Sequence, residues 1–507
     1  MRKKVYMFSE AIFMNPYQEE NDGIVSLTDA GVKEIQAHKN FYSDATKPIP
    51  REKRDWHMKD MANLWIGIIV SVAVYQVASG LLVAGMTWYE ALLTIVLGHT
   101  LVMAVAMIIG HYGVKYGMNY AMLGKAIFGQ NGLCVPAIIR GILGIFWFGV
   151  QAWIGGQATS IIISTVFPAW GDLGFPGLFI SFLIFWALNV YIAASGNKAV
   201  KILEGISAPA LIAMSLIVIV WGLSTAGWSL DTLLSAQVVQ ARGDTDFWTL
   251  FWPALSAMIA FDGGIALSMP DFTRSCVNQR AQIVGQIISA PVMTGYIAFV
   301  GICGTAGAWL AFGKEIWEPA VLVGCFPSPI IRLIFSLFII MAILTTNVAG
   351  NLIPPVNIVA SYVKGRFSYR KVAIFVAFLS LFAQPWNSLS SAYHLIFDVT
   401  QLLGALIGPI SGIYIAAYLF EYHTDLSIVD AYIEGPGKYF YSNGWNIRAI
   451  VIMLIFTAII FAGKWVPALS PLFNNAYVFG TLGACITYAL VCKLGGNSSC
   501  NTSSKTE

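Results

Sequence analysis

Long apolar runs alternate with short polar stretches along most of the chain. Many runs reach about 20 residues, the length at which a helix crosses a bilayer. Because every backbone polar group in lipid must be paired within the protein, we interpret these runs as helices. The pattern predicts an all-α integral membrane protein with twelve transmembrane helices, at 61–86, 89–114, 133–166, 174–196, 201–225, 248–268, 280–312, 329–362, 371–385, 393–420, 446–466 and 471–493.

Polar segments flank this predicted membrane domain of residues 61–493. Residues 1–60 are predicted to form an N-terminal tail, and residues 494–507 a C-terminal tail. The chain is 57% hydrophobic and only 11% charged, whereas soluble domains are about one quarter charged. The net charge of +3 carries no information about nucleic acid, and no nucleic-acid partner is expected. The seven Cys residues lack metal-ligand spacing. The expected partner is the lipid bilayer, and the oligomeric state stays open.

The basic residues between the predicted helices predict the orientation of the chain. Most of them fall in one set of loops, and the opposite set holds only Arg242, Lys314, Arg332 and Lys464. Loops rich in Lys and Arg stay in the cytoplasm. We therefore expect a multi-pass protein of the cell membrane with both termini in the cytoplasm.

Two of the predicted helices contain polar and glycine residues near their middle. The first carries Gln76 and then Ser79-Gly80, and the sixth carries Asp262 followed by Gly263-Gly264. Interrupted helices at corresponding positions predict a five-plus-five inverted repeat with a substrate site at the breaks. Glycines that only allow close helix packing are the alternative. The repeats would cover 61–225 and 248–420, with two additional C-terminal helices at 446–493.

The third predicted helix carries a pair of residues suited to a flat polar ligand. Trp147 and Gln151 are four residues apart and so share one helix face. An indole can stack on a ring, and a carboxamide offers both a hydrogen-bond donor and an acceptor. The pair indicates a planar, amide-bearing heterocycle, although a tryptophan in a membrane helix is also a common interface anchor.

The eighth predicted helix has an unusually polar patch, "TTNVAGN", at residues 345–351. Hydroxyl and carbonyl oxygens, such as those of Thr345 and Thr346, can bind a hard cation without a fixed charge. Each threonine can instead bond back to a carbonyl one turn earlier. Asn351 is a candidate for reading the edge of a substrate or for linking two helices.

Asp262 is costly at membrane depth, and such residues are usually functional. Three roles stay open for it: bonding to the substrate, carrying a proton, or stabilising the end of a broken helix. Other polar residues are interpreted as structural: His99 and His111 as packed or interfacial, Asp398 as interhelical, and Asp271 and Arg274 as gating or packing groups.

Several stretches together resemble one transporter family. The most specific are "WFGVQAWIGG" in the third helix, "MPDFTR" after the sixth and "TTNVAGNLIPP" in the eighth. The similarity extends from "RDWHMKDMANLWIG" to "LLGALIGPISGIYIA", which is nearly the whole chain. In these motifs the chain resembles the nucleobase:cation symporter-1 family, and most of all its bacterial allantoin and hydantoin branch.

The resemblance implies an inverted-repeat fold with alternating access and a set of site residues. It implies that Trp147 stacks on the substrate, and that Gln151, Asn351 and Gln76 contact it. A sodium site is implied at the carbonyls of Val72, Tyr75 and Ala342 and the hydroxyls of Thr345 and Thr346. Asp262 departs from the pattern, because the related branch has a second stacking tryptophan there. Phe261 is the candidate to replace that ring.

We therefore expect a symporter, not an enzyme, that imports a planar nitrogen heterocycle such as allantoin, a hydantoin or a nucleobase. Sodium is the expected coupling ion. The alternative is a proton-coupled permease for a different or cationic heterocycle that uses Asp262. An ion channel is disfavoured because the chain has no filter motif and no arginine ladder. An amino-acid transporter is disfavoured because Asp262 would repel a substrate carboxylate.

Overall fold

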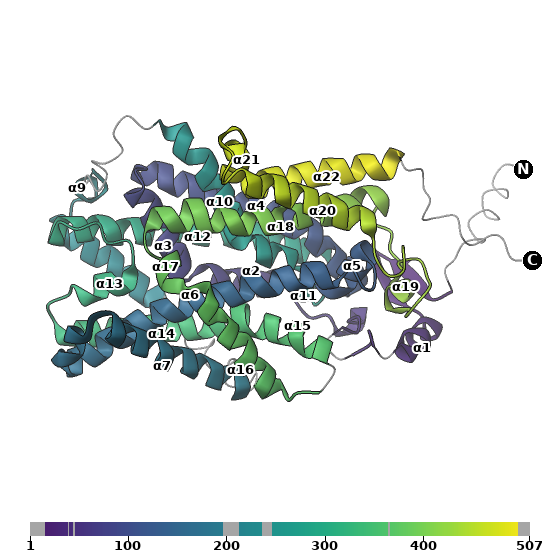
Figure 1. Ribbon diagram of the computed structural model, residues 1–507, viewed down its shortest axis with the longest axis horizontal. Helices are drawn as coiled ribbons and strands as arrows, with labels where there is room; N and C mark the ends of the chain where they lie inside the picture. Colours follow the sequence, from purple (N-terminus) through teal and green to yellow (C-terminus); the bar gives the residue numbers. More distant parts are fainter. Residues whose placement is uncertain are drawn as a thin grey trace, which may run out of the picture.

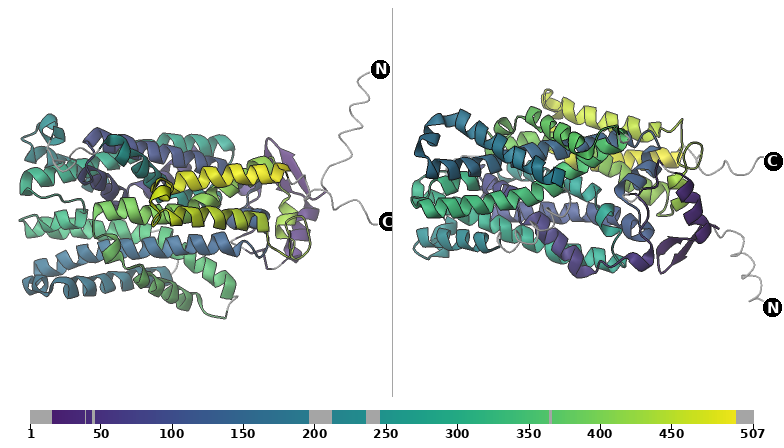
Figure 2. Two further views of the ribbon diagram at one scale, coloured as in Figure 1. Left: turned by 45° about the horizontal axis from the view of Figure 1, so that its top comes forward. Right: turned by 90° about the horizontal axis from the view of Figure 1, so that it is seen from below.

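The computed structural model describes residues 16–38, 40–43, 46–195, 212–235, 246–363 and 366–494. Most of the predicted C-terminal tail, the first part of the N-terminal tail and residues 201–211 of the predicted fifth helix lie outside this range. The described chain is a bundle of helices that run mainly along one axis (Figure 1 and Figure 2).

The first half of the chain supplies a small hairpin and the first helices. Its elements are β1 (Gln18–Asn21), β2 (Ile24–Leu27), α1 (Asp29–Ala37), η2 (Arg51–Lys53), α2 (Met58–Ile69), α3 (Val72–Val83), α4 (Trp88–Tyr116), α5 (Tyr120–Phe128), α6 (Cys134–Val166), η3 (Pro168–Leu173), α7 (Gly174–Ser195), the helix Ile212–Thr225 and α9 (Leu230–Ser235). β1 and β2 pair antiparallel.

The second half is helical throughout its described elements. They are α10 (Phe247–Leu267), α11 (Pro270–Thr273), α12 (Gln279–Phe312), α13 (Pro319–Gly324), α14 (Pro329–Thr346), η5 (Asn347–Leu352), α15 (Ile353–Val363), α16 (Tyr369–Leu379), η6 (Ser380–Ala383), α17 (Pro385–Ser388), η7 (His394–Val399), α18 (Thr400–Ala416), η8 (Ala417–Glu421), α19 (Ile428–Tyr432), α20 (Ile447–Ala462), η9 (Pro467–Leu469), α21 (Ser470–Asn474) and α22 (Ala476–Leu494).

Within the described residues, seven helices are long and apolar enough to cross a membrane, or up to nine if two bent pairs each count as one. The helical membrane architecture expected from the apolar pattern is therefore confirmed, whereas the count of twelve and the repeat stay predictions. Several predicted bounds agree closely with the structure. For example, the predicted helix at 133–166 corresponds to α6, and that at 280–312 to α12.

One end of the bundle holds β1, α1, α5 and α19, and we call it the terminal end (right in Figure 1). Side chains join these elements across long sequence distances. Gln18 accepts a hydrogen bond from Ile428 N at 2.9 Å, and Lys125 Nζ donates to Ile433 O at 2.6 Å. The opposite end, which carries α9 and α13, lies on the left in Figure 1.

The first membrane segment is broken, but the break does not lie at Gln76 or Gly80, where the sequence predicts it. α2 and α3 meet at an angle of 57°, and the residues between them are Val70 and Ser71. Ser71 is the N-cap of α3, and its hydroxyl accepts from Val74 N at 3.4 Å. Gln76 and Gly80 lie inside α3. A Cβ on Gly80 would come within 2.9 Å of the Ile396 side chain, so this glycine serves close packing.

The predicted break at Gly263-Gly264 is wrong, because α10 continues through both residues to Leu267. A Cβ on Gly263 would lie 2.6 Å from the Tyr477 ring and 2.7 Å from Ile407, so this glycine admits α22 and α18 against α10. The chain turns only at Ser268 and Met269, before α11 begins.

The predicted eighth helix changes its winding at the polar patch. η5 is a π-helical segment between α14 and α15. Pro354 and Pro355 follow it and lack the N–H groups that would pair with the carbonyls four residues earlier. Single π turns of this kind are frequent at functional sites.

Candidate functional site

A cavity of about 470 Å³ lies between α2, α6, the end of α10 and η5. It extends from Trp147 and Asn351 towards the terminal end, where Asn63, Arg140 and Asp271 lie on its wall. Its volume is within the range of small-molecule sites. The lining residues are Asn63, Leu64, Gly67, Ile68, Val70, Ser71, Ala73, Arg140, Leu143, Trp147, Gln151, Phe261, Asp262, Gly264, Ile265, Ser268, Asp271, Phe272, Thr346, Gly350, Asn351 and Pro354.

Five of the six predicted substrate residues line this cavity: Trp147, Gln151, Phe261, Asp262 and Asn351. The sixth, Gln76, is 1% exposed and lies outside the lining. Its Nε2 is buried without a hydrogen-bond partner. The structure therefore brings together residues from α6, α10 and η5, and leaves Gln76 behind the wall formed by α3.

The aromatic part of the wall consists of Trp147 and Phe261. Their ring centroids are 4.8 Å apart and their planes meet at 68°, an edge-to-face contact. Two rings at this angle do not form a parallel sandwich. A flat ligand in the cavity therefore has one indole face to stack on, and Phe261 supports that indole from the side.

Hydrogen bonds to neighbouring groups of the protein hold the amide side chains on and behind the cavity wall. Thr346 Oγ1 lies 3.2 Å from Gln151 Oε1, to which it can donate. Asn351 Nδ2 donates to Asn347 Oδ1 at 3.1 Å, and Asn347 Nδ2 donates to Phe148 O at 3.2 Å. These bonds fix the direction of the Asn347 and Asn351 carboxamides, whereas the single Thr346 proton is shared between Gln151 Oε1 and Ala342 O. Gln151 can still donate through Nε2 to a ligand, and Asn351 can still accept through Oδ1.

His99 is the partner of Asp262, which the sequence did not indicate. His99 Nε2 on α4 lies 2.7 Å from Asp262 Oδ2 on α10, and the two side chains are 0% and 4% exposed. The interpretation of His99 as a packed or interfacial residue missed this contact. Asp262 does not stabilise a helix end either, because α10 is unbroken there.

Arg140 and Ser268 are further polar residues of the wall that the sequence pattern did not indicate as site residues. Arg140 Nε donates to Ser268 Oγ at 3.1 Å. Asp271, predicted as a gating or packing residue, accepts a hydrogen bond from Tyr120 N at 2.9 Å and so holds the start of α5. An arginine inside an apolar run is a signal that could have identified Arg140.

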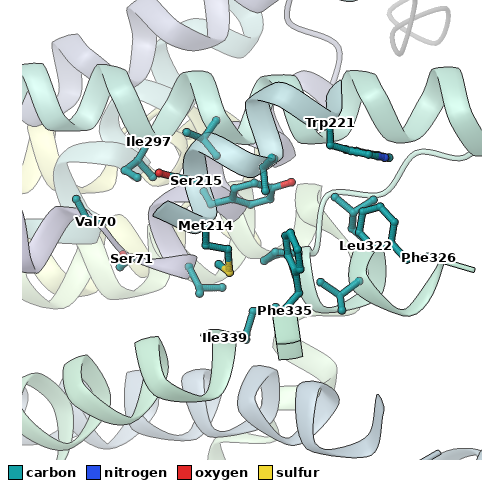
Figure 3. Close-up of a pocket in the computed structure, with 16 residues that line it drawn as sticks. Val70, Ser71, Met214, Ser215, Trp221, Ile297, Leu322, Phe326, Phe335 and Ile339 are labelled. Atoms are coloured by element: carbon teal, nitrogen blue, oxygen red, sulfur yellow. The ribbon is translucent and has the colours of Figure 1, made fainter. Parts of the chain in front are cut away.

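The predicted sodium ligands occupy two neighbouring helices. On α14, Thr346 Oγ1 lies 3.1 Å from Ala342 O, which is the bond back to the preceding turn that was the alternative to a cation role. On α3, Val72 and Tyr75 line a separate cavity of about 60 Å³ (Figure 3). The side chain of Thr345 lies outside the described residues.

The remaining predicted polar residues lie away from the cavity. Asp398 is not interhelical, because it pairs with His394 of its own segment η7 at 2.9 Å. His111 Nδ1 lies 2.7 Å from the Tyr418 hydroxyl. Within the described residues, no group of three or more His, Cys, Asp or Glu side chains is arranged to hold a metal ion.

Comparison with known proteins gives concordant results over most of the chain. A family model described as permease for cytosine/purines, uracil, thiamine and allantoin matches residues 48–480. The purine-uracil permease NCS1 of Arabidopsis thaliana is 32% identical over 441 residues, which cover 84% of this chain and 72% of that protein. The allantoin permease of Bacillus subtilis is 28% identical over 478 residues, covering 91% and 96% of the two chains.

Solved structures show the same fold. The inward-facing conformation of Mhp1 matches with a TM-score of 0.77 at 21% identity, covering 90% of this chain and 94% of that one. A closed conformation of Mhp1, a nucleobase-cation-symport-1 family transporter, with bromovinylhydantoin bound, matches with a TM-score of 0.72 at 20% identity, covering 90% and 96%.

Proposed function

Since the chain belongs to the family of permeases for cytosine/purines, uracil, thiamine and allantoin, we propose that it is a cation-coupled symporter for a small planar nitrogen heterocycle. Its relatives are permeases, so the chain is a membrane transporter and not an enzyme. The observation that carries the proposal is the central cavity, where Trp147, Gln151 and Asn351 lie on one wall.

These three residues recognise the substrate by complementary means. The indole of Trp147 offers a flat apolar face, which suits a conjugated ring. Gln151 Nε2 donates to a ring carbonyl, and Asn351 Oδ1 accepts from a ring N–H. Allantoin, hydantoins and nucleobases all combine a compact polar ring with adjacent carbonyl and N–H groups, and form the substrate class we propose.

Transport proceeds by alternating access in a five-plus-five inverted repeat of twelve helices with both termini in the cytoplasm. The cavity extends towards the terminal end, so this conformation is assigned as inward-facing. At the opposite end, Gln157 Nε2 of α6 donates to Glu318 Oε2 at the start of α13 at 2.8 Å. This bond joins α6 to α13 at that end and supports the assignment.

Sodium is the proposed coupling ion, held by the carbonyls of Val72, Tyr75 and Ala342 and the hydroxyls of Thr345 and Thr346. Thr346 also lies against Gln151, so one residue of the ion site contacts one residue of the substrate site. An ion bound at the hydroxyl oxygen would turn its O–H towards Gln151 Oε1 and fix that amide. Because coupling is reciprocal, the substrate should then tighten sodium binding by the same factor.

Uptake by the purified chain in liposomes tests this function. Labelled allantoin, hydantoin, uracil, cytosine and a purine should be offered with and without an inward sodium gradient. We expect saturable uptake of at least one compound that rises with sodium. Trp147→Ala should weaken substrate binding by about tenfold or more, because the stacking face is lost. Thr346→Ala should abolish the response to sodium.

A matched control is Thr100→Ala, which removes an exposed hydroxyl that bonds back to Val96 O in the same way as Thr346 does to Ala342 O. It should leave uptake and its sodium dependence unchanged. Uptake that ignores sodium but follows a proton gradient would favour the second candidate, a proton-coupled permease. The contact between His99 and Asp262 is the observation that supports this candidate.

A further inference from the structure

The short contact between His99 and Asp262 places a buried imidazole beside a buried carboxylate. His99 Nδ1 lies 3.2 Å from Ile95 O. A carbonyl oxygen only accepts, so Nδ1 carries a proton. Nε2 of a neutral ring and a carboxylate oxygen would then be two acceptors 2.7 Å apart. The two atoms lie close together without the alignment of a hydrogen bond, so an imidazolium beside the carboxylate, with a net charge of zero, is the arrangement that avoids repulsion between two acceptors.

The packing of α4 on α10 produces this contact. A Cβ on Gly98 would lie 2.5 Å from Cβ of Met258, one turn before Asp262. The missing side chain lets the two helices approach closely, and the next residue, His99, meets the carboxylate. Both ring nitrogens are thereby used within the protein, while Asp262 still lies on the cavity wall.

The two oxygens of Asp262 have different surroundings. Oδ2 is fully buried and faces His99. Oδ1 is the oxygen left for the cavity, on the same wall as Trp147 and Phe261. Because His99 balances the charge of the carboxylate, Oδ1 can accept a hydrogen bond from a ligand without leaving a net negative charge on this part of the wall.

We propose that His99 is a positioning and specificity-determining residue, which neutralises Asp262 so that its Oδ1 selects a neutral heterocycle by an N–H group. The proposal rests on the proposed function and deepens it. The acceptor lies on the cavity wall beside the edge-to-face pair of Trp147 and Phe261, so the substrate is chosen on this side by a hydrogen bond and not by a second parallel ring.

The other charges near the pair agree with a neutral ligand. On the cavity wall, among the residues that the structure describes, the remaining ionisable groups are Arg140 on α6 and Asp271 on α11, which have opposite sign. η7, which also packs against α10, carries the His394–Asp398 pair. Among the described residues around the cavity, no net negative charge is left over to attract a cationic ring, which argues against the cationic substrate considered for Asp262.

Four variants of the full-length protein test the proposal through ligand binding. The probes are uracil, its N1-methyl and N3-methyl derivatives, hydantoin, and a methylpyridinium cation. Wild type should bind uracil or hydantoin, and one N-methyl derivative should bind about tenfold more weakly or worse, because Oδ1 loses its donor. Asp262→Leu should lower affinity for the N–H probe by a similar factor and abolish the discrimination between N–H and N-methyl forms.

Asp262→Asn is the matched variant, because its amide N–H can donate to His99 Nε2 while its oxygen still faces the cavity. Affinity within about threefold of wild type and intact discrimination are expected. His99→Leu leaves an unbalanced carboxylate, so neutral probes should bind about tenfold more weakly and the cation relatively better. The double variant His99→Leu with Asp262→Asn removes that charge and should restore binding of the neutral probes.

The outcomes distinguish a failure of the proposed function from a failure of the role assigned to His99 and Asp262. If wild type binds none of the neutral heterocycles, the proposed function and this inference both fail. If wild type binds them but Asp262→Leu keeps the discrimination, or Asp262→Asn loses it in a folded protein, only the role of the pair is overturned. Thermal melting of each variant identifies any that has not folded. If Asp262→Leu or His99→Leu has not folded, the comparison of Asp262→Asn with wild type decides whether the pair has the proposed role.

Discussion

The first membrane segment and α10 contain similar residues in the middle of apolar runs but have different shapes. α2 and α3 meet at 57° around Val70 and Ser71, where there is no glycine. α10 passes through Asp262, Gly263 and Gly264 without interruption. The break therefore lies at a capping serine, and Gly263 marks a place where neighbouring helices come close.

Glycine and a charged residue therefore indicate different features of a membrane helix: glycine indicates close helix packing, and the charged residue indicates a polar partner or a cavity. Gly263 lies at the contact of α10 with α22 and α18, whereas Asp262 lies against His99 of α4 and lines the cavity. Neither requires the helix to open. In the first segment, by contrast, Ser71 satisfies the free N–H of Val74, so the backbone can change direction at low cost.

The largest effect is expected when the close contact at Gly263 is filled. Gly263→Val should lower the free energy of unfolding by about 1–3 kcal/mol, because the new methyl groups would overlap the Tyr477 ring and Ile407. The measurement is reversible unfolding or thermal melting in detergent. Equal stability of the variant would mean that α10 can open at this point, and would remove the difference between the two segments.

A smaller effect is expected at the break of the first segment. Ser71→Ala should cost about 1 kcal/mol, the usual value of an N-cap, since Val74 N loses its acceptor. Ser71 also lines the central cavity, so the variant should be compared with Ser71→Thr, which keeps the hydroxyl. If both variants lose the same stability, the cap does not maintain the bend.

The parts of the fold that the sequence predicted follow from length and composition. The apolar runs predicted α6 and α12 to within one residue at each start, because the bilayer imposes a minimum helix length. The positions of the breaks were not predictable in this way. The positions of the breaks depend on whether Ser71 lies near a free N–H and whether Gly263 faces another helix. The sequence alone contains neither piece of information.

The residues of the candidate site also fall into those that the sequence predicts and those that only the packing identifies. Trp147 and Gln151 were expected together because four residues separate them on one helix, and both line the cavity. His99 gave no local signal, because its role depends on the rotation of α4 against α10. The glycine before it is visible in the sequence, but only the packing identifies Met258 as its neighbour.

The smallest effect, of opposite sign, is expected one residue beyond Gly263. Gly264 faces the cavity, and the nearest atoms to an added Cβ would be Leu143 Cδ2 at 3.6 Å and Arg140 Nε at 3.9 Å. Gly264→Ala therefore meets no overlap and should stabilise α10 by up to about 1 kcal/mol, since alanine loses less backbone entropy in a helix. Melting of this variant beside Gly263→Val measures the difference between two adjacent glycines in one scan. A loss of stability in Gly264→Ala would show that α10 needs backbone freedom here, as an interrupted helix would. A gain would leave close packing at Gly263 as the one structural requirement for glycine in this part of α10.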